Sequence, residues 1–284
     1  MVGRCGTPQN IIRHMTSAEP ASLGRRDKGA VLMKKTDYKA IAENYDKNKY
    51  RQEVKQDEDL KGYIDKGLTP AIKVLDLACG TGIYLQNQIN YFQDVSIEWH
   101  GLDASEEMLQ KAKNKISSCR FVSGLAEELP YDLDSFDFVI NNYAFHHFCQ
   151  KSEVLDEVVR VLKKKGVLKI HNISVHDMRH WWIYEFFPSA YFEDLKRFWP
   201  KDLIFNELSN RGFDVDVRME FVMKANRIAD FMDHAYNRDI SALSLISDVE
   251  YHHGIEMMEY KIKKDPDALV INDFADIVFI ATKR

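Results

Sequence analysis

Short apolar runs alternate with longer amphipathic stretches between residues 72 and 173. The runs predict buried strands at 72–77, 96–102, 120–122, 136–141 and 166–173. Strands separated by helical stretches are typical of a parallel sheet with crossover helices. This part of the chain is therefore expected to form the centre of an α/β fold.

The stretch before the fifth strand carries a helical repeat. Apolar residues recur there with i, i+3, i+4, i+7 spacing, at Leu155, Val158, Val159 and Leu162. This spacing predicts a helix that lays one face on the sheet. The basic run 163–165 is expected to close the helix, where cations offset the helix dipole, and Gly166 to form a left-handed cap.

The C-terminal part predicts one more helix and two more strands. A helix is expected at 202–210, ended by Gly212, and 215–223 and 275–281 are expected to form a final antiparallel pair. A helical insertion separates the two strands. We therefore predict a seven-stranded sheet with the last strand antiparallel and helices on both faces.

The N-terminal residues differ from this pattern. Residues 1–32 have no helical or strand period, so we predict a disordered extension. Met33 begins a stretch that reads as a natural start, and whether 1–32 belongs to the native protein stays open, with a targeting peptide as the alternative. The domain itself is expected at 33–284, with N-terminal cap helices at 33–70 and lid insertions at 174–200 and 225–270.

Composition narrows the class of protein. The 39 Lys and Arg against 44 Asp and Glu give a net charge of −5, which argues against nucleic-acid binding because phosphates require a concentrated basic surface. The four cysteines form no CxxC pair and fit a reducing compartment. No apolar run approaches the roughly 20 residues that span a bilayer. We predict a cytoplasmic protein that binds neither membrane nor nucleic acid.

The stretch 74–85, VLDLACGTGIYL, is a strand that turns on small residues and reopens as a helix. Gly80 and Gly82 permit backbone torsions and a close ligand approach that side chains would forbid, and the helix N-terminus favours a negative group. Leu85 occupies the third glycine position of a dinucleotide fingerprint. Asp76 would repel a pyrophosphate but attract an ammonium group. A ligand with amine and carboxylate together, such as S-adenosylmethionine, fits best.

The segment DLACGTG resembles the first motif of the class I S-adenosylmethionine-dependent methyltransferases, whose fold is Rossmann-like, with Ala78 in place of the leading glycine. The resemblance implies that Asp76 lies near the methionine amine, that Gly80 to Gly82 face the methionyl and ribose portions, and that Ala78 and Cys79 also contact the cofactor. Asp103 ends the second strand, where a carboxylate can accept hydrogen bonds from both ribose hydroxyls.

Further motifs occur in the order expected of this family. After Asp103, Ala104 and Met108 are expected beside the ribose and adenine. The segment 124–130 resembles the third motif, but Leu125 stands where an acid is common, so adenine recognition is expected to depend on Ala126 or Glu127. The segment 135–148, with Asn141 at the cofactor, resembles methyltransferases of type 11 and of the UbiE-like small-molecule group. The resemblance is strong over 72–173.

Histidines supply the candidate catalytic groups. His146 and His147 follow the fourth strand, where a base can take a proton from a phenol, alcohol or acidic carbon; packing near the cofactor is the alternative. His176 and His180 stand at i, i+4 spacing and raise the question of a metal. No acid completes such a site, so no metal is expected.

Aromatic residues supply the candidate substrate groups. The segment 181–199 is rich in aromatic residues, and it is interpreted either as a helix packed on the core or as a lid over an apolar acceptor. The residues proposed to contact substrate are Tyr143, Trp181, Trp182, Tyr184 and Phe187. Tyr45 and Tyr50 are expected to close over the cofactor, as the segment before the first strand does in related methyltransferases, or else to anchor an amphipathic helix.

These observations predict an enzyme that transfers a methyl group from S-adenosylmethionine to oxygen, nitrogen or carbon of a small molecule, with S-adenosylhomocysteine as product. An aromatic or hydrophobic acceptor is favoured. The alternatives are methylation of a protein or RNA partner, a non-catalytic S-adenosylmethionine-binding subunit, and a nicotinamide oxidoreductase. The chain is expected to be a monomer or a homodimer.

Overall fold

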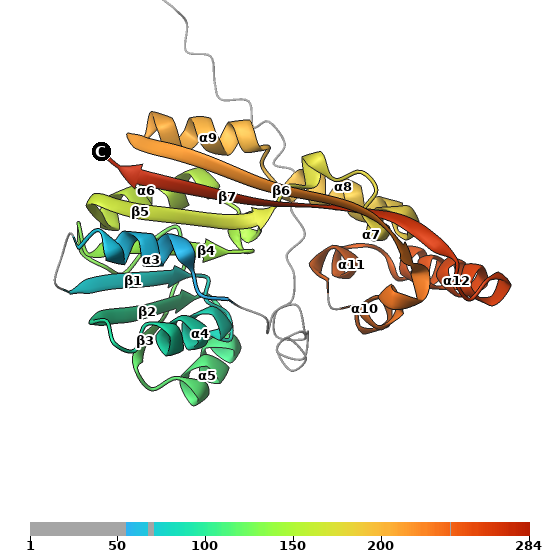
Figure 1. Cartoon of the computed structure of the whole chain (residues 1–284), viewed down its shortest axis with the longest axis horizontal. Coiled ribbons are helices and arrows are strands. Elements are labelled where there is room, and N and C mark those ends of the chain that lie inside the picture. Colours follow the sequence, from blue (N-terminus) through green and yellow to red (C-terminus); the bar gives the residue numbers. More distant parts are fainter. Residues whose placement is uncertain (1–54, 68–70, 239) are drawn as a thin grey trace, which may run out of the picture. The chain divides into compact units, whose positions relative to one another are not determined.

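The computed structural model describes residues 55–67, 71–238 and 240–284. Its sheet has seven strands in the order β3-β2-β1-β4-β5-β7-β6 (Figure 1). The strands are β1 Ile72–Leu77, β2 Ile97–Asp103, β3 Cys119–Ser123, β4 Phe136–Asn142, β5 Leu162–Ile173, β6 Phe213–Arg227 and β7 Leu269–Lys283. β7 runs antiparallel to both of its neighbours. The predicted seven-stranded sheet with an antiparallel last strand is confirmed.

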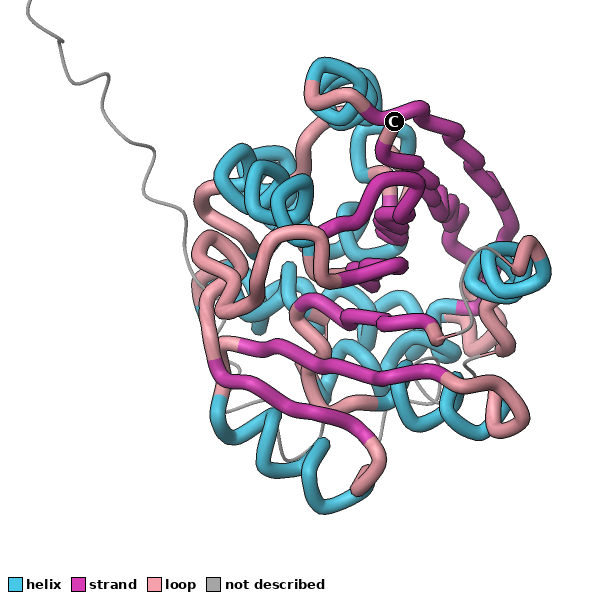
Figure 2. Tube along the Cα trace, turned by 90° about the vertical axis from the view of Figure 1, so that its left-hand side faces the viewer, coloured by secondary structure: helices cyan, strands magenta, loops and turns pink. Residues whose placement is uncertain are grey.

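Helices cover both faces of the sheet (Figure 2). On one face, α3 Glu58–Asp65, α4 Ile83–Tyr91 and α5 Glu106–Lys115 enclose a core with β1 and β4. On the other, α6 Lys151–Val161 and α9 Lys201–Asn210 enclose a core with β4, β5 and β7. The central parallel strands β1 and β4 are buried on both sides, as their continuous apolar runs require.

The start of β5 differs from the prediction. The helix α6 ends at Val161, and the basic run 163–165 lies in β5 and does not close the helix. The left-handed residue is Lys165, with φ 64°, and Gly166 is not a left-handed cap. Gly166 is instead required by packing, because a Cβ there would lie 2.8 Å from the carbonyl oxygen of Lys163.

The final strand pair is longer than predicted. β6 and β7 stay in register from Phe213, opposite Lys283, to Arg227, opposite Leu269. The helical insertion therefore begins later than residue 225, at η3 Ile228–Phe231, and continues through α10 Met232–Asn237, α11 Ser241–Leu245 and α12 Asp248–Lys264. Backbone pairing extends a two-stranded ribbon beyond the sheet, which the side-chain alternation did not reveal.

The two insertions pack against each other in a hydrophobic cluster that we call the second core. The segment after β5 forms the 3-10 helix η2 Val175–Asp177, then α7 Trp182–Phe186 and α8 Pro188–Arg197. Its aromatic side chains meet those of the later insertion; the rings of Trp182 and Phe231 stack with centroids 4.9 Å apart. A role of this helical unit as a lid stays a prediction.

Two groups of expectations lie outside the described residues: the extension 1–32, and the cap segment 33–70 apart from α3 and its flanks. Among the helices that the structure describes, none is both long and apolar enough to cross a membrane.

Candidate active site

The loop after β1 has the backbone geometry of a ligand-binding turn. Ala78, Gly80 and Gly82 all have left-handed backbones, with φ of 63°, 54° and 77°. Gly82 is the N-cap of α4, so the free N–H groups of that helix begin at the turn. Ala78 holds this conformation at a cost of about 1 kcal/mol because its Cβ crowds the backbone. The loop at the carboxyl edge of the sheet is therefore strained at Ala78.

Asp103 ties this loop to the end of β2. Its Oδ2 accepts a hydrogen bond from the backbone N–H of Gly80 at 2.8 Å, and its Oδ1 accepts one from Ser105 at 2.9 Å. Ser105 in turn caps α5 by accepting from the N–H of Met108. Burial raises the pKa of Asp103, and the N–H groups that it accepts from act in the opposite direction. The carboxylate is thereby fixed where the two strands end together.

Asp76 is the second acid of this edge. It is buried, and the loss of hydration together with the negative charge of Asp103 raises its pKa to about 8. The carboxyl group is therefore largely protonated at neutral pH in the free protein. A cation bound beside it would favour the charged form, so the pair of acids is suited to receive a positively charged group.

Asn141 supports the loop from β4. Its Nδ2 donates to the carbonyl oxygen of Leu77 at 2.7 Å. Its Oδ1 is buried and has no hydrogen-bond partner among the described residues. A buried acceptor without a donor is costly, and a bound ligand with an N–H or O–H group would satisfy it.

The residues predicted at the ribose and adenine lie around the ends of β2 and β3. Ala126 and Met108 are buried, Glu127 is half-buried, and Ala104 and Leu125 are exposed. The segment after β3 is joined to the end of β2, because the N–H of Gly124 donates to the carbonyl oxygen of Asp103. Their contacts with a cofactor stay predictions, as do those of Cys79, while Tyr45 and Tyr50 lie outside the described residues.

His146 and His147 lie in η1 Phe145–His147, directly after β4. The ring of His146 is buried and stacks on Phe198 with centroids 4.1 Å apart. Burial, followed by the positive charges of Arg197 and Lys151, lowers the pKa of His147 to about 3. Burial also places the pKa of His146 far below its ordinary value. Both rings are poor proton acceptors, and their role as bases stays a prediction.

The aromatic residues proposed for substrate are mostly core residues. Trp181, Trp182, Tyr184 and Phe187 are buried in the second core, and the hydroxyl of Tyr184 donates to Asp194. This packing matches the first of the two interpretations of the segment, and their contact with a substrate stays a prediction. His176 and His180 do not share a helix, because η2 ends at Asp177.

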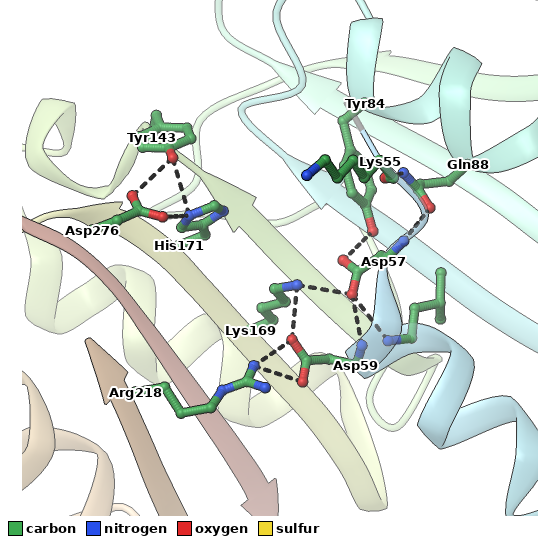
Figure 3. Close-up of polar contacts among 11 residues, drawn as sticks. Lys55, Asp57, Asp59, Tyr84, Gln88, Tyr143, Lys169, His171, Arg218 and Asp276 are labelled. Atoms are coloured by element: carbon green, nitrogen blue, oxygen red, sulfur yellow. Dashed lines mark hydrogen bonds and ion pairs between the residues drawn. The ribbon is translucent and has the colours of Figure 1, made fainter. Parts of the chain in front are cut away.

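Three polar side chains meet at the edge formed by β4, β5 and β7 (Figure 3). The hydroxyl of Tyr143 donates to Asp276 Oδ1 at 2.8 Å, and His171 Nε2 lies 2.6 Å from Asp276 Oδ2 and 3.0 Å from the hydroxyl oxygen. Sequence reasoning proposed Tyr143 for substrate contact but did not join it to the other two. The available signal was the position of His171 near the end of β5 and of Asp276 near the start of the strand predicted at 275–281.

A second polar group, also drawn in Figure 3, connects α3 to the sheet. Lys169 of β5 pairs with Asp57 and Asp59 at 2.8 and 2.9 Å. Asp57 also accepts from the hydroxyl of Tyr84, in the first turn of α4, at 2.8 Å. This group anchors the segment before β1 to the helix that opens at the ligand-binding turn.

Comparisons with known proteins show which family the central part of the chain resembles. Residues 68–197 match the family model of a methyltransferase domain. The chain is 26% identical over 175 residues to the ubiquinone/menaquinone biosynthesis C-methyltransferase UbiE of Campylobacter jejuni, covering 51% of this chain and 71% of that protein. It is 39% identical over 98 residues to the demethylmenaquinone methyltransferase of Thermotoga maritima, covering 34% and 42%.

Solved structures show the same fold. A crystal structure assigned to a methyltransferase of an antibiotic biosynthesis pathway in Anabaena variabilis matches with a TM-score of 0.60 and 19% identity, over 82% of this chain and all of that one. The chain spans only part of the length of the curated relatives that it matches. It covers 52% of an uncharacterized methyltransferase of Synechocystis and 58% of an uncharacterized protein of Methanocaldococcus jannaschii.

Proposed function

We propose that the chain is a class I S-adenosylmethionine-dependent methyltransferase, the family that its residues 68–197 resemble, and that it methylates a small hydrophobic or aromatic molecule. The sulfonium of the cofactor supplies an activated methyl group. The protein's task is to align a nucleophile with the carbon–sulfur bond and to exclude water. Two of its relatives carry names of quinone-precursor methyltransferases, which supports a hydrophobic acceptor.

The observation that carries the proposal is the convergence of Asp76, the left-handed turn and Asp103 at one edge of the sheet. The turn would receive the methionyl carboxylate at the N-terminus of α4, Asp76 the ammonium group, and Asp103 the ribose hydroxyls. Asn141 Oδ1 offers an unused acceptor nearby. The net charge of −5 supports a small-molecule substrate over RNA. We also propose that the protein is cytoplasmic.

Calorimetric titration with S-adenosylhomocysteine and, separately, with NAD tests the proposal. We expect binding of the former alone. Replacing Asp103 with alanine should weaken that binding about 10- to 100-fold, since hydrogen bonds to a charged group contribute about 1.5–3 kcal/mol. The exposed Asp94→Ala variant is the matched control and should bind like the wild type. Preference for NAD, or unchanged affinity in Asp103→Ala, would contradict the assignment.

Asp76 predicts a pH dependence of cofactor binding. Its pKa of about 8 in the free protein must fall when an ammonium group binds beside it, so binding releases a proton. The bound state then holds fewer protons, and affinity rises with pH up to about 8 and levels off above it. Titrations at pH 7 in two buffers of different ionisation enthalpy measure the released proton. The Asp76→Asn variant should release none, and an equal release from both proteins would refute the assignment.

A further inference from the structure

We propose that Tyr143, His171 and Asp276 are the proton-accepting group of the active site and that the methyl acceptor is a phenol. This inference rests on the proposed function, because it assigns the acceptor of that reaction. The first observation is the position of these residues in the sheet. The ligand-binding turn follows β1, Tyr143 follows β4 and His171 is near the end of β5, and these strands are neighbours in the sheet.

We call Tyr143, His171 and Asp276 the triad. Adjacent strands are about 4.8 Å apart, so the triad lies roughly one to two strand spacings from the turn. Ligands of open α/β sheets bind at this carboxyl edge. A cofactor held over β1 and β2 leaves the space beyond β4 for the second substrate. Tyr143, His171 and Asp276 line the edge on that side.

The backbone of Tyr143 is unusual. Its φ is 50°, a left-handed conformation that a bulky aromatic residue rarely adopts. Its N–H donates to the carbonyl oxygen of His171 at 2.7 Å, which fixes it against β5. Strained residues of this kind concentrate at functional sites. The conformation brings the hydroxyl to Asp276 and His171 while 45% of the residue remains exposed.

The triad is ordered but open to a ligand. The side chains of His171 and Asp276 are 24% and 28% exposed, unlike the buried His146. The ring of Tyr143 lies 4.5 Å from that of His171, and the two together offer an aromatic surface. The loss of hydration around the hydroxyl, followed by the charge of Asp276, raises the pKa of Tyr143, so its hydroxyl stays protonated and can relay a proton.

The chemistry of the triad suits a neutral hydroxyl acceptor. The acceptor's O–H bond breaks as its proton passes to the oxygen of Tyr143, whose own proton moves to the His171–Asp276 pair. The oxygen of the resulting phenolate forms a bond to the methyl carbon. The electron pair of the broken carbon–sulfur bond stays on sulfur, and the triad later gives its proton to water. A neutral amine attacks with its own lone pair and does not need this deprotonation.

The test uses the full-length protein, S-adenosylmethionine and ring-substituted phenols of graded acidity, from unsubstituted phenol to 4-nitrophenol, at pH 8. We expect His171→Gln and Tyr143→Phe to lower kcat about 100-fold on the weakly acidic phenols, the scale of general-base catalysis. The loss should be much smaller on 4-nitrophenol, which is already ionised. Affinity for S-adenosylhomocysteine should not change, and His253→Gln, an exposed residue of α12, should behave like the wild type.

The outcomes separate the two proposals. Failure of the wild type to bind S-adenosylhomocysteine would overturn the proposed function. Binding without methylation of any phenol would overturn the acceptor class assigned here. An equal loss of kcat across the whole series would show that the triad is structural, and no loss in His171→Gln would remove it from the mechanism.

Discussion

Replacing Lys169 with methionine is expected to lower the free energy of unfolding by about 3–5 kcal/mol, the cost of removing one partner from a buried ion pair. The side chain of Lys169 is only 10% exposed, and its ammonium group contacts both Asp57 and Asp59 (Figure 3). Methionine fills a similar volume but removes the ammonium group from Asp57, while Asp59 keeps its contact with Arg218 at 2.6 Å. Urea unfolding at pH 7 measures the loss.

The same variant has a predicted pH dependence. Burial alone would raise the pKa of Asp59, but hydrogen bonds and charges from Lys169 and Arg218 lower it below the ordinary value. A carboxyl group with a lowered pKa stabilises the fold above the pKa of the unfolded chain, about 3.9, and loses that contribution as the pH falls through its folded pKa. The difference between wild type and variant should therefore be complete at pH 7 and shrink below about pH 4.

Lys73→Met is the control for this experiment. Lys73 is a half-exposed lysine that pairs with Glu98 at 3.2 Å. Exposed pairs of this kind contribute about 1 kcal/mol or less. This variant should therefore unfold almost like the wild type both at pH 7 and below about pH 4. Equal losses in Lys169→Met and Lys73→Met would mean that burial of the first pair adds nothing.

The Lys169 group also connects stability to the ligand-binding turn. The N–H of Asp57 donates to Gln88 Oε1 at 2.8 Å, and Gln88 Nε2 donates to the carbonyl oxygen of Lys55 at 2.8 Å. Gln88 and Tyr84 both belong to α4, which begins at Gly82. The segment at residues 55–57 is thus held on the helix whose N-terminus would receive the cofactor.

Local features of the fold were predictable from the sequence. The limits of β1 are those predicted, since a run of buried apolar residues ends there in a glycine turn. The start of β5 was missed because the basic run 163–165 satisfies the rule for a helix terminus as well as that for a solvent-exposed strand. Its pairing begins at Leu162 opposite Phe136 and then shifts register, and such an irregularity has no signature in one segment.

The candidate site was also predictable from the sequence only in part. The motif around Gly80 was found because its residues are contiguous. His171 and Asp276 are 105 positions apart, and Lys169 and Asp57 are 112 apart. Their contact depends on how strands and helices from distant parts of the chain pack, in particular on the antiparallel register that places Ile173 opposite Asp276. Composition and spacing contain no information on that register.

Replacing Gly254 with alanine is expected to destabilise the second core. Gly254 is buried in α12, and a Cβ there would lie 2.2 Å from Phe187 Cε1 and 2.6 Å from the carbonyl oxygen of Phe186. Alanine favours a helix over glycine by about 1 kcal/mol, whereas overpacking costs about 1–3 kcal/mol and sometimes more. Because one contact is with backbone that cannot rotate away, we expect a cost above that range and a net loss of about 2 kcal/mol.

Thermal unfolding should show this as a fall in Tm of about 4–8 °C for a domain of this size. Gly62→Ala in α3 is the matched control, because a Cβ at Gly62 has no neighbour within 4 Å. This control gains the helix preference without a clash, so its Tm should rise slightly. If Gly254→Ala is as stable as Gly62→Ala, α12 does not pack on Phe187, and the second core does not join the two insertions as described.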